Sequence, residues 1–342
     1  MVKIKLFIAF TFSLLFCACQ SGNNDKIVIV ESGTSLSPSQ KIDSLSTLIQ
    51  LDSLNADLYF QRAELRLKNN ELNLGSIDLE RTVKLDPKNT KYWFKLGVLN
   101  FSKQESRRAR DCWLTCTDLD SRNIDCRLNL AEMFLAIGEL KKGQNLLNEI
   151  LDFDPKNSYA LFLTGNYALM RLDTTKAIKY IQSAINEDQD LFKAYDQLGV
   201  IYSSRKDLLA IDYFNSALRL KPNRFDVHYK VAMFYQSLSF FDEATQAYLR
   251  VLELNSSHEL SLHNLGVIAV FTEDYKSAVK YFSSAISLNA SFLEAYFGRA
   301  YTYELMDEFL KSESDYRTSL MFDPAYLPSI EGLSRLKSTN SN

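Results

Sequence analysis

Two sets of residues have the types that a metal or phosphate site needs, but their spacing does not fit the chemistry. A zinc-binding helix needs two histidines four residues apart so that both lie on one face, whereas His258 and His263 are five apart. Gly138 and Gly143 have the glycine spacing of a phosphate-binding loop, yet Gln144 follows where that loop needs lysine. The sequence therefore predicts no metal site and no cofactor.

A third set has the residue types of nucleophilic catalysis. Ser203 and Lys206 are spaced like the nucleophile and lysine of penicillin-binding enzymes, but they fall in a predicted turn that has no partner motif. The chain has three histidines, and none has a serine or cysteine partner that the repeat geometry would bring to it. We therefore predict that the protein is not an enzyme and has no small-molecule substrate.

The cysteines leave one question open. Cys112 and Cys116 share a predicted helix face, while Cys116 and Cys126 lie at the end of one predicted helix and the start of the next. One disulfide is conceivable in an oxidising compartment, whereas a cysteine at a small, packed position is more often an ordinary core residue.

Composition indicates helices and excludes some partners. Among 342 residues there are only 11 glycines and 6 prolines, too few for the many turns of an all-β protein. The formal charge of -3 gives no overall positive field, so we expect no nucleic-acid partner. The basic run Arg107-Arg108-x-Arg110 is interpreted as a solvated turn.

The first residues are typical of an export signal. Lys3 and Lys5 precede an apolar run from Leu6 to Leu15, which is too short to span a bilayer. The following Phe16-Cys17-Ala18-Cys19 resembles the lipobox of bacterial lipoproteins, with Phe16 where that family usually has leucine. The resemblance implies that residues 1–18 are removed and that Cys19 carries the lipid. Ordinary signal cleavage nearby and an uncleaved anchor are the alternatives.

Residues 19–37 are predicted to be a flexible tether, because they are mostly polar and rich in glycine and serine. Gln20 stands where lipoproteins held at the inner membrane of enterobacteria have aspartate. By resemblance, the expected location is the cell envelope, on the periplasmic side of the outer membrane.

The rest of the chain repeats with a period of 34 residues. Three series of positions share this period, two of small residues and one of bulky residues. The first small series is Ala63, Gly97, Ala131, Gly165, Gly199, Ala232, Gly266 and Ala300. The second is Gly75, Ala109, Gly143, Ala177, Ala210, Ala244, Ala278 and Ser312. The bulky series is Leu79, Trp113, Leu147, Ile181, Phe214, Tyr248, Phe282 and Tyr316.

These series define eight repeats. Within each, apolar residues show helical spacing twice, at positions 4, 7, 8 and 11 and again at 20, 24, 27 and 28, so each repeat is predicted to be two helices joined by a turn. The fifth repeat is one residue short, which we assign to the turn around Arg205-Lys206-Asp207. The repeats are 56–89, 90–123, 124–157, 158–191, 192–224, 225–258, 259–292 and 293–326.

This pattern resembles the tetratricopeptide repeat (TPR). Repeat 90–123 carries it clearly, with Trp93, Leu96-Gly97, Ala109 and Trp113. The resemblance implies an all-α fold, a right-handed superhelical solenoid of antiparallel helix pairs. Two repeats have arginine at position 7 and aspartate sixteen residues later, which we interpret as ion pairs within one repeat: Arg62 with Asp78, and Arg299 with Asp315.

Both ends of the array are predicted to be capped. Before it, residues 38–55 hold a lone second helix, Pro38 to Leu51, that covers the first repeat through Leu45, Leu48 and Ile49. After it, residues 327–342 are a capping helix and tail that packs through Ile330 and Leu333.

In the family, the concave groove is built from positions 2, 5, 9, 12 and 13 of the first helices. The resemblance therefore implies a partner-binding groove lined by Phe60, Phe94, Phe101, Phe162, Met170, Tyr229, Met233, His263, Phe271, Phe297 and Tyr301. Exposed aromatic and methionine side chains favour protein contact. We expect a lipid-anchored, non-enzymatic adaptor that binds a protein or an extended peptide. The alternatives are a scaffold without lipid and a peptidoglycan- or carbohydrate-binding envelope protein.

Overall fold

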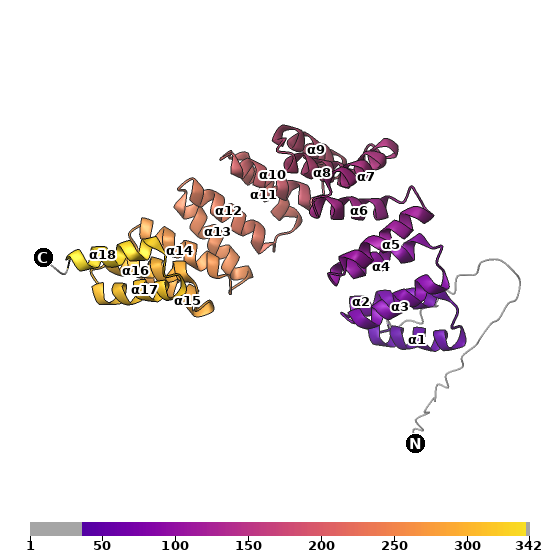
Figure 1. Cartoon of the computed structure of the whole chain (residues 1–342), viewed down its shortest axis with the longest axis horizontal. Helices are drawn as coiled ribbons and strands as arrows, with labels where there is room; N and C mark the ends of the chain where they lie inside the picture. The colour runs from indigo at the N-terminus through magenta and orange to yellow at the C-terminus, as the bar shows by residue number, and fades with distance from the viewer. Residues whose placement is uncertain (1–35, 340–342) are drawn as a thin grey trace, which may run out of the picture. The chain divides into compact units, whose positions relative to one another are not determined.

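The computed structural model describes residues 36–339, which are helical apart from short connections. The predicted signal peptide, Cys19 and nearly all of the predicted tether lie outside the described residues. The helices pair along the chain in a TPR-like arrangement, so the all-α prediction is confirmed (Figure 1). Within this part of the chain, none of the helices combines the length and apolar character required to cross a bilayer.

The chain folds as two compact units, and the boundary between them lies between Leu85 and Asp86. The described part of the N-terminal unit contains α1 (Pro38–Leu51), α2 (Ala56–Lys68) and α3 (Leu72–Leu85). The C-terminal unit contains seven helix pairs: α4 (Thr90–Ser102) with α5 (Ser106–Leu119), α6 (Ile124–Ala136) with α7 (Leu140–Phe153), α8 (Ser158–Met170) with α9 (Thr174–Glu187), α10 (Phe192–Ser204) with α11 (Leu209–Leu220), α12 (Phe225–Ser237) with α13 (Phe241–Leu254), α14 (Glu259–Phe271) with α15 (Tyr275–Leu288), and α16 (Leu293–Leu305) with α17 (Phe309–Phe322). A final helix, α18 (Leu327–Thr339), follows them.

Each helix pair is joined by the same tight turn. Position 15 of every repeat has a positive φ, and only one of the eight residues there is a glycine, Gly138. In most repeats the next amide donates back to the carbonyl at position 11, as Asp173 does to Ala168 at 2.9 Å. These are the features of a Schellman motif, which ends a helix and reverses the chain within two residues.

The shortened fifth repeat corrects one prediction. The turn keeps its positive-φ residue, Lys206, so the missing residue does not come from the turn. It comes from the start of the second helix, because α11 has 12 residues where the other second helices have 14. The turn cannot be shortened because its left-handed residue reverses the chain, whereas the first turn of a helix can lose a residue with little loss of packing.

Small residues let the two helices of a pair approach closely. A Cβ atom added to Gly97 would lie 2.3 Å from Nε1 of Trp113, and one added to Gly199 would lie 2.4 Å from Cδ1 of Phe214. All eight residues of the bulky series are buried. Gly97 of the first small series therefore lies directly against Trp113 of the bulky series.

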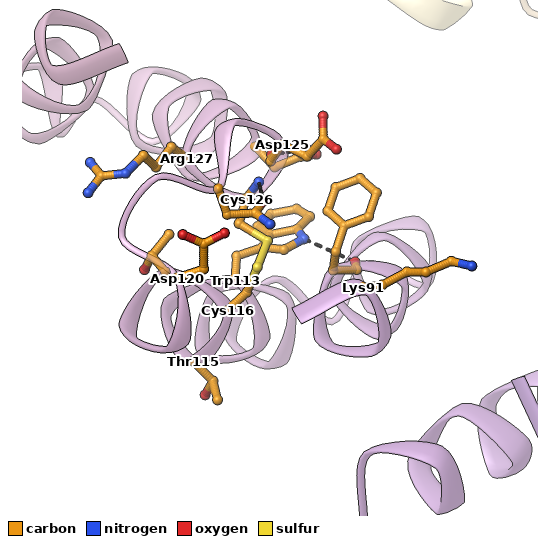
Figure 2. The surroundings of a disulfide bond; sticks show 12 residues. Lys91, Trp113, Thr115, Cys116, Asp120, Asp125, Cys126 and Arg127 are labelled. Carbon is orange, nitrogen blue, oxygen red and sulfur yellow. Dashed lines mark hydrogen bonds between the residues drawn. A yellow bond between two sulfur atoms is a disulfide. The ribbon is translucent and has the colours of Figure 1, made fainter. Parts of the chain in front are cut away.

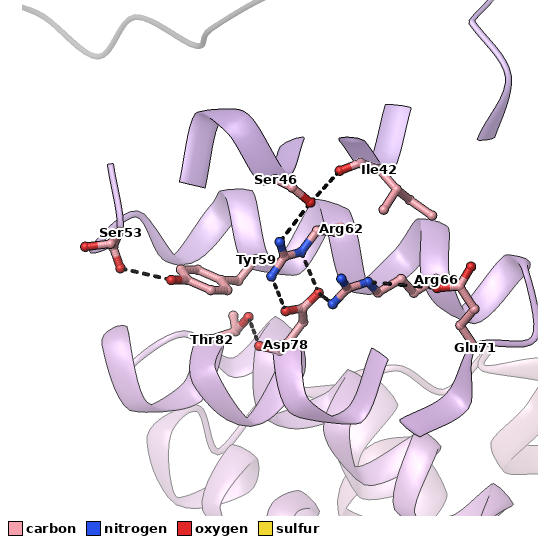
Figure 3. A network of polar contacts seen from close by, with 9 residues as sticks. All are labelled: Ile42, Ser46, Ser53, Tyr59, Arg62, Arg66, Glu71, Asp78 and Thr82. Atoms are coloured by element: carbon pink, nitrogen blue, oxygen red, sulfur yellow. Dashed lines mark hydrogen bonds and ion pairs between the residues drawn. The ribbon is translucent and has the colours of Figure 1, made fainter. Parts of the chain in front are cut away.

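The two predicted arginine–aspartate pairs are present. In the N-terminal unit, Arg62 donates from Nε and Nη2 to both oxygens of Asp78, at 2.9 and 2.7 Å, and Arg66 adds a bond of 2.6 Å (Figure 3). Arg62 also donates to Ser46 of α1 at 3.0 Å. Because Asp78 is almost fully buried, three donors from two arginines compensate the loss of its hydration.

Arg299 repeats this constellation in the C-terminal unit. It donates to Asp315 at 2.7 and 2.9 Å and to Ser283 of the preceding second helix at 2.9 Å. In both cases the serine lies 16 residues before the arginine. Helix α1 therefore occupies, relative to α2, the place that the second helix α15 occupies relative to α16.

The two ends are covered by helices. Leu45 and Ile49 of α1 are buried in a cluster with Leu58, and Leu48 packs against that cluster, as predicted. At the other end the predicted contacts need correction, because Ile330 is exposed and Leu336 is buried instead. The reason is that α18 approaches Tyr316 through Gly332, which places Leu333 and Leu336 against the core.

Cys116 and Cys126 form a disulfide that joins α5 to α6 (Figure 2). Cys112, one turn before Cys116, is buried and takes no part in this disulfide. The bond links the second helix of one repeat to the first helix of the next, and it answers the question that the sequence left open.

Candidate functional site

The first helices of the C-terminal unit share one surface, which we call the first-helix face. It consists of the side chains at positions 2, 5, 6, 9, 12 and 13 of α4, α6, α8, α10, α12, α14 and α16. Positions 7, 8 and 11 of the same helices point instead toward the second helices. Neighbouring first helices touch directly, α6 with α8, α10 with α12 and α14 with α16.

Five of the predicted groove residues are exposed on this face: Phe101, Met170, Met233, Phe271 and Tyr301. Phe271 is the most exposed of them, at 68%. All five come from positions 9, 12 or 13, which is the half of the first helix nearest the turn. They are the predicted residues that remain available to a partner.

The predicted residues at position 5 are not exposed. Phe162 is 5% exposed and lies in a core cluster, and Phe60, in the separate N-terminal unit, is 2% exposed. Phe94, Tyr229, His263 and Phe297 are half-buried. Phe60 and Phe162 are therefore core residues, which corrects their assignment to an exposed lining.

Position 5 is buried because side chains at positions 24 and 34 of the same repeat pack against it. The Phe297 ring lies 5.9 Å from the Tyr316 ring at position 24 and 5.7 Å from the Tyr326 ring at position 34. His263 lies in the same way between Phe282 and Phe292, at 5.6 and 5.2 Å. A ring at position 5 thus packs between its own second helix and the residue that leads into the next helix.

Polar side chains link the first helices across this face. Tyr159 of α8 donates to Glu132 of α6 at 2.9 Å, and Lys193 of α10 donates to the Tyr159 hydroxyl at 2.6 Å and to Glu132 at 3.2 Å. Further along, Lys230 of α12 bonds both oxygens of Asp196 of α10 at 2.7 Å. These bonds hold four consecutive first helices in register.

The environment shifts the pKa values of this network. Burial raises the pKa of the Tyr159 hydroxyl, so it stays a neutral donor. Burial opposes the charge on Lys193, but its bond to Tyr159 and the attraction of Glu132 prevail and raise its pKa. The network therefore keeps a neutral hydroxyl on Tyr159 and a positive charge on Lys193 at neutral pH.

The histidines have structural roles. His258 begins α14 and accepts from the Ser261 amide at 3.2 Å, while its ring lies 4.8 Å from the Tyr229 ring. Burial lowers the pKa of both His258 and His263, which favours the neutral form. Across residues 36–339 no group of three or more His, Cys, Asp or Glu side chains is placed to hold a metal ion.

Sequence reasoning missed the polar half of the first-helix face. The signal was present in the period, because Tyr159 and Lys193 share position 2 of consecutive repeats, and Lys230 lies one residue beyond the position equivalent to Asp196. Complementary groups one period apart lie side by side on neighbouring first helices. A search for charge complementarity at that spacing would have found them.

Comparisons with known proteins agree with this architecture. The family model described as "Tetratricopeptide repeat" matches residues 260–292. The TPR repeat-containing protein MJ1428 of Methanocaldococcus jannaschii is 22% identical over 225 residues, which are 60% of this chain and 39% of that protein. The peroxisomal targeting signal receptor of Kluyveromyces lactis is 22% identical over 222 residues, 64% of this chain and 39% of the receptor.

The chain thus spans about 39% of the length of these two relatives. A crystal structure of the C-terminal part of a TPR repeat-containing protein from Cytophaga hutchinsonii superimposes with a TM-score of 0.58 at 18% identity. That superposition covers 70% of this chain and 99% of the other. It supports the fold of paired helices.

Proposed function

We propose that this tetratricopeptide repeat protein is a lipid-anchored scaffold of the bacterial cell envelope that binds a protein or an extended peptide along its first-helix face. The observation that carries the binding role is the set of exposed apolar side chains on that face: Phe101, Met170, Met233, Phe271 and Tyr301. Large exposed apolar side chains that recur along one face favour a macromolecular partner.

The polar bonds between first helices support the same function. Glu132, Tyr159 and Lys193 fix three helices relative to one another, and Asp196 with Lys230 fixes a fourth. A surface that is ordered before binding loses less entropy when a partner docks. Between the rigid bonds, Met170 and Met233 supply flexible side chains that adapt to the partner's shape.

Two further features support parts of the proposal. The Kluyveromyces lactis relative is, by its name, a receptor for a targeting signal, which favours a peptide ligand for an array of this kind. The lipobox-like Phe16-Cys17-Ala18-Cys19 favours attachment to the membrane through Cys19, and Gln20 favours the outer membrane.

The binding role is tested with charge placed on the first-helix face. The variants are Met233→Lys, Phe271→Lys and the double variant that combines them. The unaltered chain is used to capture partners from solubilised envelope, and the captured proteins are quantified by mass spectrometry. Each variant should fail to capture the proteins that the unaltered chain enriches. Leu310→Lys is the control, because Leu310 is apolar and even more exposed, at 85%, but lies on the second helix α17. If Met233→Lys, Phe271→Lys and the double variant all capture the same proteins as the unaltered chain, the first-helix face is not the binding site.

The anchor is tested separately. Cells supplied with labelled palmitate should label the chain, and Cys19→Ser should remove both the label and retention in the membrane fraction. Equal labelling of Cys19→Ser would refute lipid attachment at this residue and would leave the binding role untouched.

A further inference from the structure

A cleft of about 790 Å³ lies on the side of the second helices, between α5 and α7 and above α6. Its apolar lining comes from all three helices: Leu114 from α5, Leu130 and Phe134 from α6, and Leu146 from α7. The α6 residues occupy positions 7 and 11, which face away from the first-helix face. A volume of this size lies within the range of ligand-binding clefts.

Charged residues form the rim of this α5–α7 cleft, and the two ends differ. At the end where α5 and α7 begin, the rim has two cations, Arg110 and Lys142, and one carboxylate, Glu139. Arg110 pairs with Asp111 at 2.8 Å, and Lys142 pairs with Glu139 while its ammonium lies 5.4 Å from the Phe134 ring centre. In these pairs the Lys142 side chain is 65% exposed and the Arg110 side chain 43% exposed.

At the other end the lining has one cation, Arg127, and two carboxylates, Asp118 and Glu149. Arg127 of α6 donates to the Ser121 carbonyl at 2.6 Å and pairs with Glu149 of α7, and its side chain is mostly buried. In Figure 2, Arg127 extends from α6 on the opposite side of the disulfide from Lys91, a residue of the first-helix face. The cleft is therefore separate from that face.

Positive charge is concentrated at the open end. Segments 103–111 and 139–142 hold six basic and three acidic residues, in a chain whose formal charge is -3. Arg107 and Lys141 extend the patch and are exposed. Neither α5 nor α7 has a side-chain cap, so their first amides add to the attraction for an anion.

We propose that the α5–α7 cleft is a second binding site, which takes a segment of a partner protein that carries bulky apolar side chains beside carboxylates. The apolar side chains pack against Leu114 and Leu146, over the buried floor formed by Leu130 and Phe134, and the carboxylates meet Arg110 and Lys142. The choice of an acidic segment follows from charge complementarity with the basic end. The site is independent of the proposed first-helix face.

The disulfide keeps this cleft in shape. Cys116 lies in α5 among wall residues Leu114, Thr117 and Asp118, and Cys126 lies one turn before the floor residue Leu130. The covalent bond therefore fixes one wall to the floor. A site held in this way does not need to be ordered by its ligand.

The probe for the test is a fluorescein-labelled twelve-residue peptide with leucine and phenylalanine one helical turn apart, flanked by glutamates. Its binding to the full chain is followed by fluorescence anisotropy. Arg110→Glu combined with Lys142→Glu should weaken binding at least tenfold, and Leu114→Ser should weaken it about fivefold. A peptide with lysine in place of every glutamate should not bind.

The repeats supply matched controls. Lys176 has the same position in its repeat as Lys142, and Leu249 has the same position and nearly the same exposure as Leu114. Lys176→Glu and Leu249→Ser should leave binding within twofold of the unaltered chain. If the double charge reversal lowers the melting temperature, Arg110→Gln with Lys142→Gln replaces it, with an intermediate loss expected.

Several results would overturn the proposal. One is the absence of peptide binding to the unaltered chain, and another is equal binding by the rim variants. A third is loss of peptide binding in Met233→Lys with Phe271→Lys, which would place the peptide on the first-helix face. A fourth is binding to phosphatidylglycerol vesicles that depends on Arg110 and Lys142 while the peptide stays unbound, because the patch would then serve a membrane. Since the two faces are altered by different variants, failure at one is distinguishable from failure at the other.

Discussion

Gly97→Ala tests the packing that defines each helix pair with the smallest possible change. An added Cβ atom would lie 2.3 Å from Nε1 and 2.6 Å from Cδ1 of Trp113, whereas carbon atoms in favourable contact are about 3.5–4.0 Å apart. Trp113 is 1% exposed and packs among Ala109, Cys116 and Leu130. The indole has little room to retreat, so the clash must move the two helices apart.

The size of the effect follows from three contributions. Overpacking of a core costs about 1–3 kcal/mol. Displacement of the indole also lengthens its 3.4 Å bond to the Phe94 carbonyl, and a hydrogen bond contributes about 0.5–1.5 kcal/mol. Alanine is a better helix former than glycine by about 1 kcal/mol, which offsets part of the loss. We expect the free energy of unfolding to fall by about 1–3 kcal/mol.

Native-state hydrogen exchange and urea unfolding measure this loss and its location. Exchange should accelerate in α4, α5 and α6 and stay unchanged in α14–α17, because each repeat contacts only its neighbours. Adding Trp113→Leu should recover part of the stability, since Ala63 and Leu79 form that pair in the first repeat. The reasoning is refuted if Gly97→Ala is as stable as the unaltered chain, or if exchange rises equally in every helix.

Three other substitutions test local features. Leu172 is 90% exposed with φ of 61°, so Leu172→Gly should raise stability by about 0.5–1 kcal/mol, and a lower melting temperature would contradict this. Cys116→Ala with Cys126→Ala should lower the urea-unfolding free energy by about 2–3 kcal/mol through loss of a ten-residue loop constraint, and no loss would show that the bond is dispensable. Burial lowers the pKa of His263 below its unfolded value, so stability should fall as pH drops below about 6.5. His263→Gln should reduce that acid sensitivity in α14–α16, and an unchanged pH profile by hydrogen exchange would exclude His263 as its source.

The sequence predicts the helix pairs well because the period is a packing requirement. Gly97 and Trp113 must approach closely, and the same condition recurs at Gly199 with Phe214. A larger residue at the glycine position would separate the two helices. The small and bulky series can therefore be recognised from the sequence alone. The N-terminal cap is predictable for the same reason, since Leu45 and Ile49 show helical spacing and are buried as expected.

The candidate site is less predictable because a position on one side of a helix can be either exposed in the groove or covered by neighbouring side chains. Helical periodicity places Phe162 and Phe271 on the same general side of their helices. Only the structure shows that position 5 is covered by the residue that leads into the next repeat, so that Phe162 is buried while Phe271 at position 13 is exposed. Contacts between repeats, rather than the periodicity within one repeat, decide which rings a partner can reach.

The identity of the core residue at position 24 also shapes the first-helix face. Tyr248 and Tyr316 donate from their hydroxyls to Gln236 and Glu304 at position 12, each at 2.6 Å. These two tyrosines lie opposite Ala232 and Ala300 at position 8, whereas the glycines of that series lie opposite tryptophan, isoleucine or phenylalanine. A tyrosine at position 24 thus engages a polar residue at position 12, near the end of the first helix.

The exposed apolar residues of the first-helix face lie at two heights along the helices. Val98, Val200, Met233 and Tyr301 are exposed at position 9, and Phe101, Met170, Phe271 and Leu305 are exposed at positions 12 or 13. In α12 the Tyr248 hydroxyl engages Gln236 at position 12, and Met233, one turn earlier, supplies the exposed apolar contact. Trp113, Ile181 and Phe282 have no hydroxyl to engage position 12, and their repeats expose Phe101, Met170 and Phe271 at positions 12 or 13. A partner that spans the face therefore meets apolar contacts at both heights.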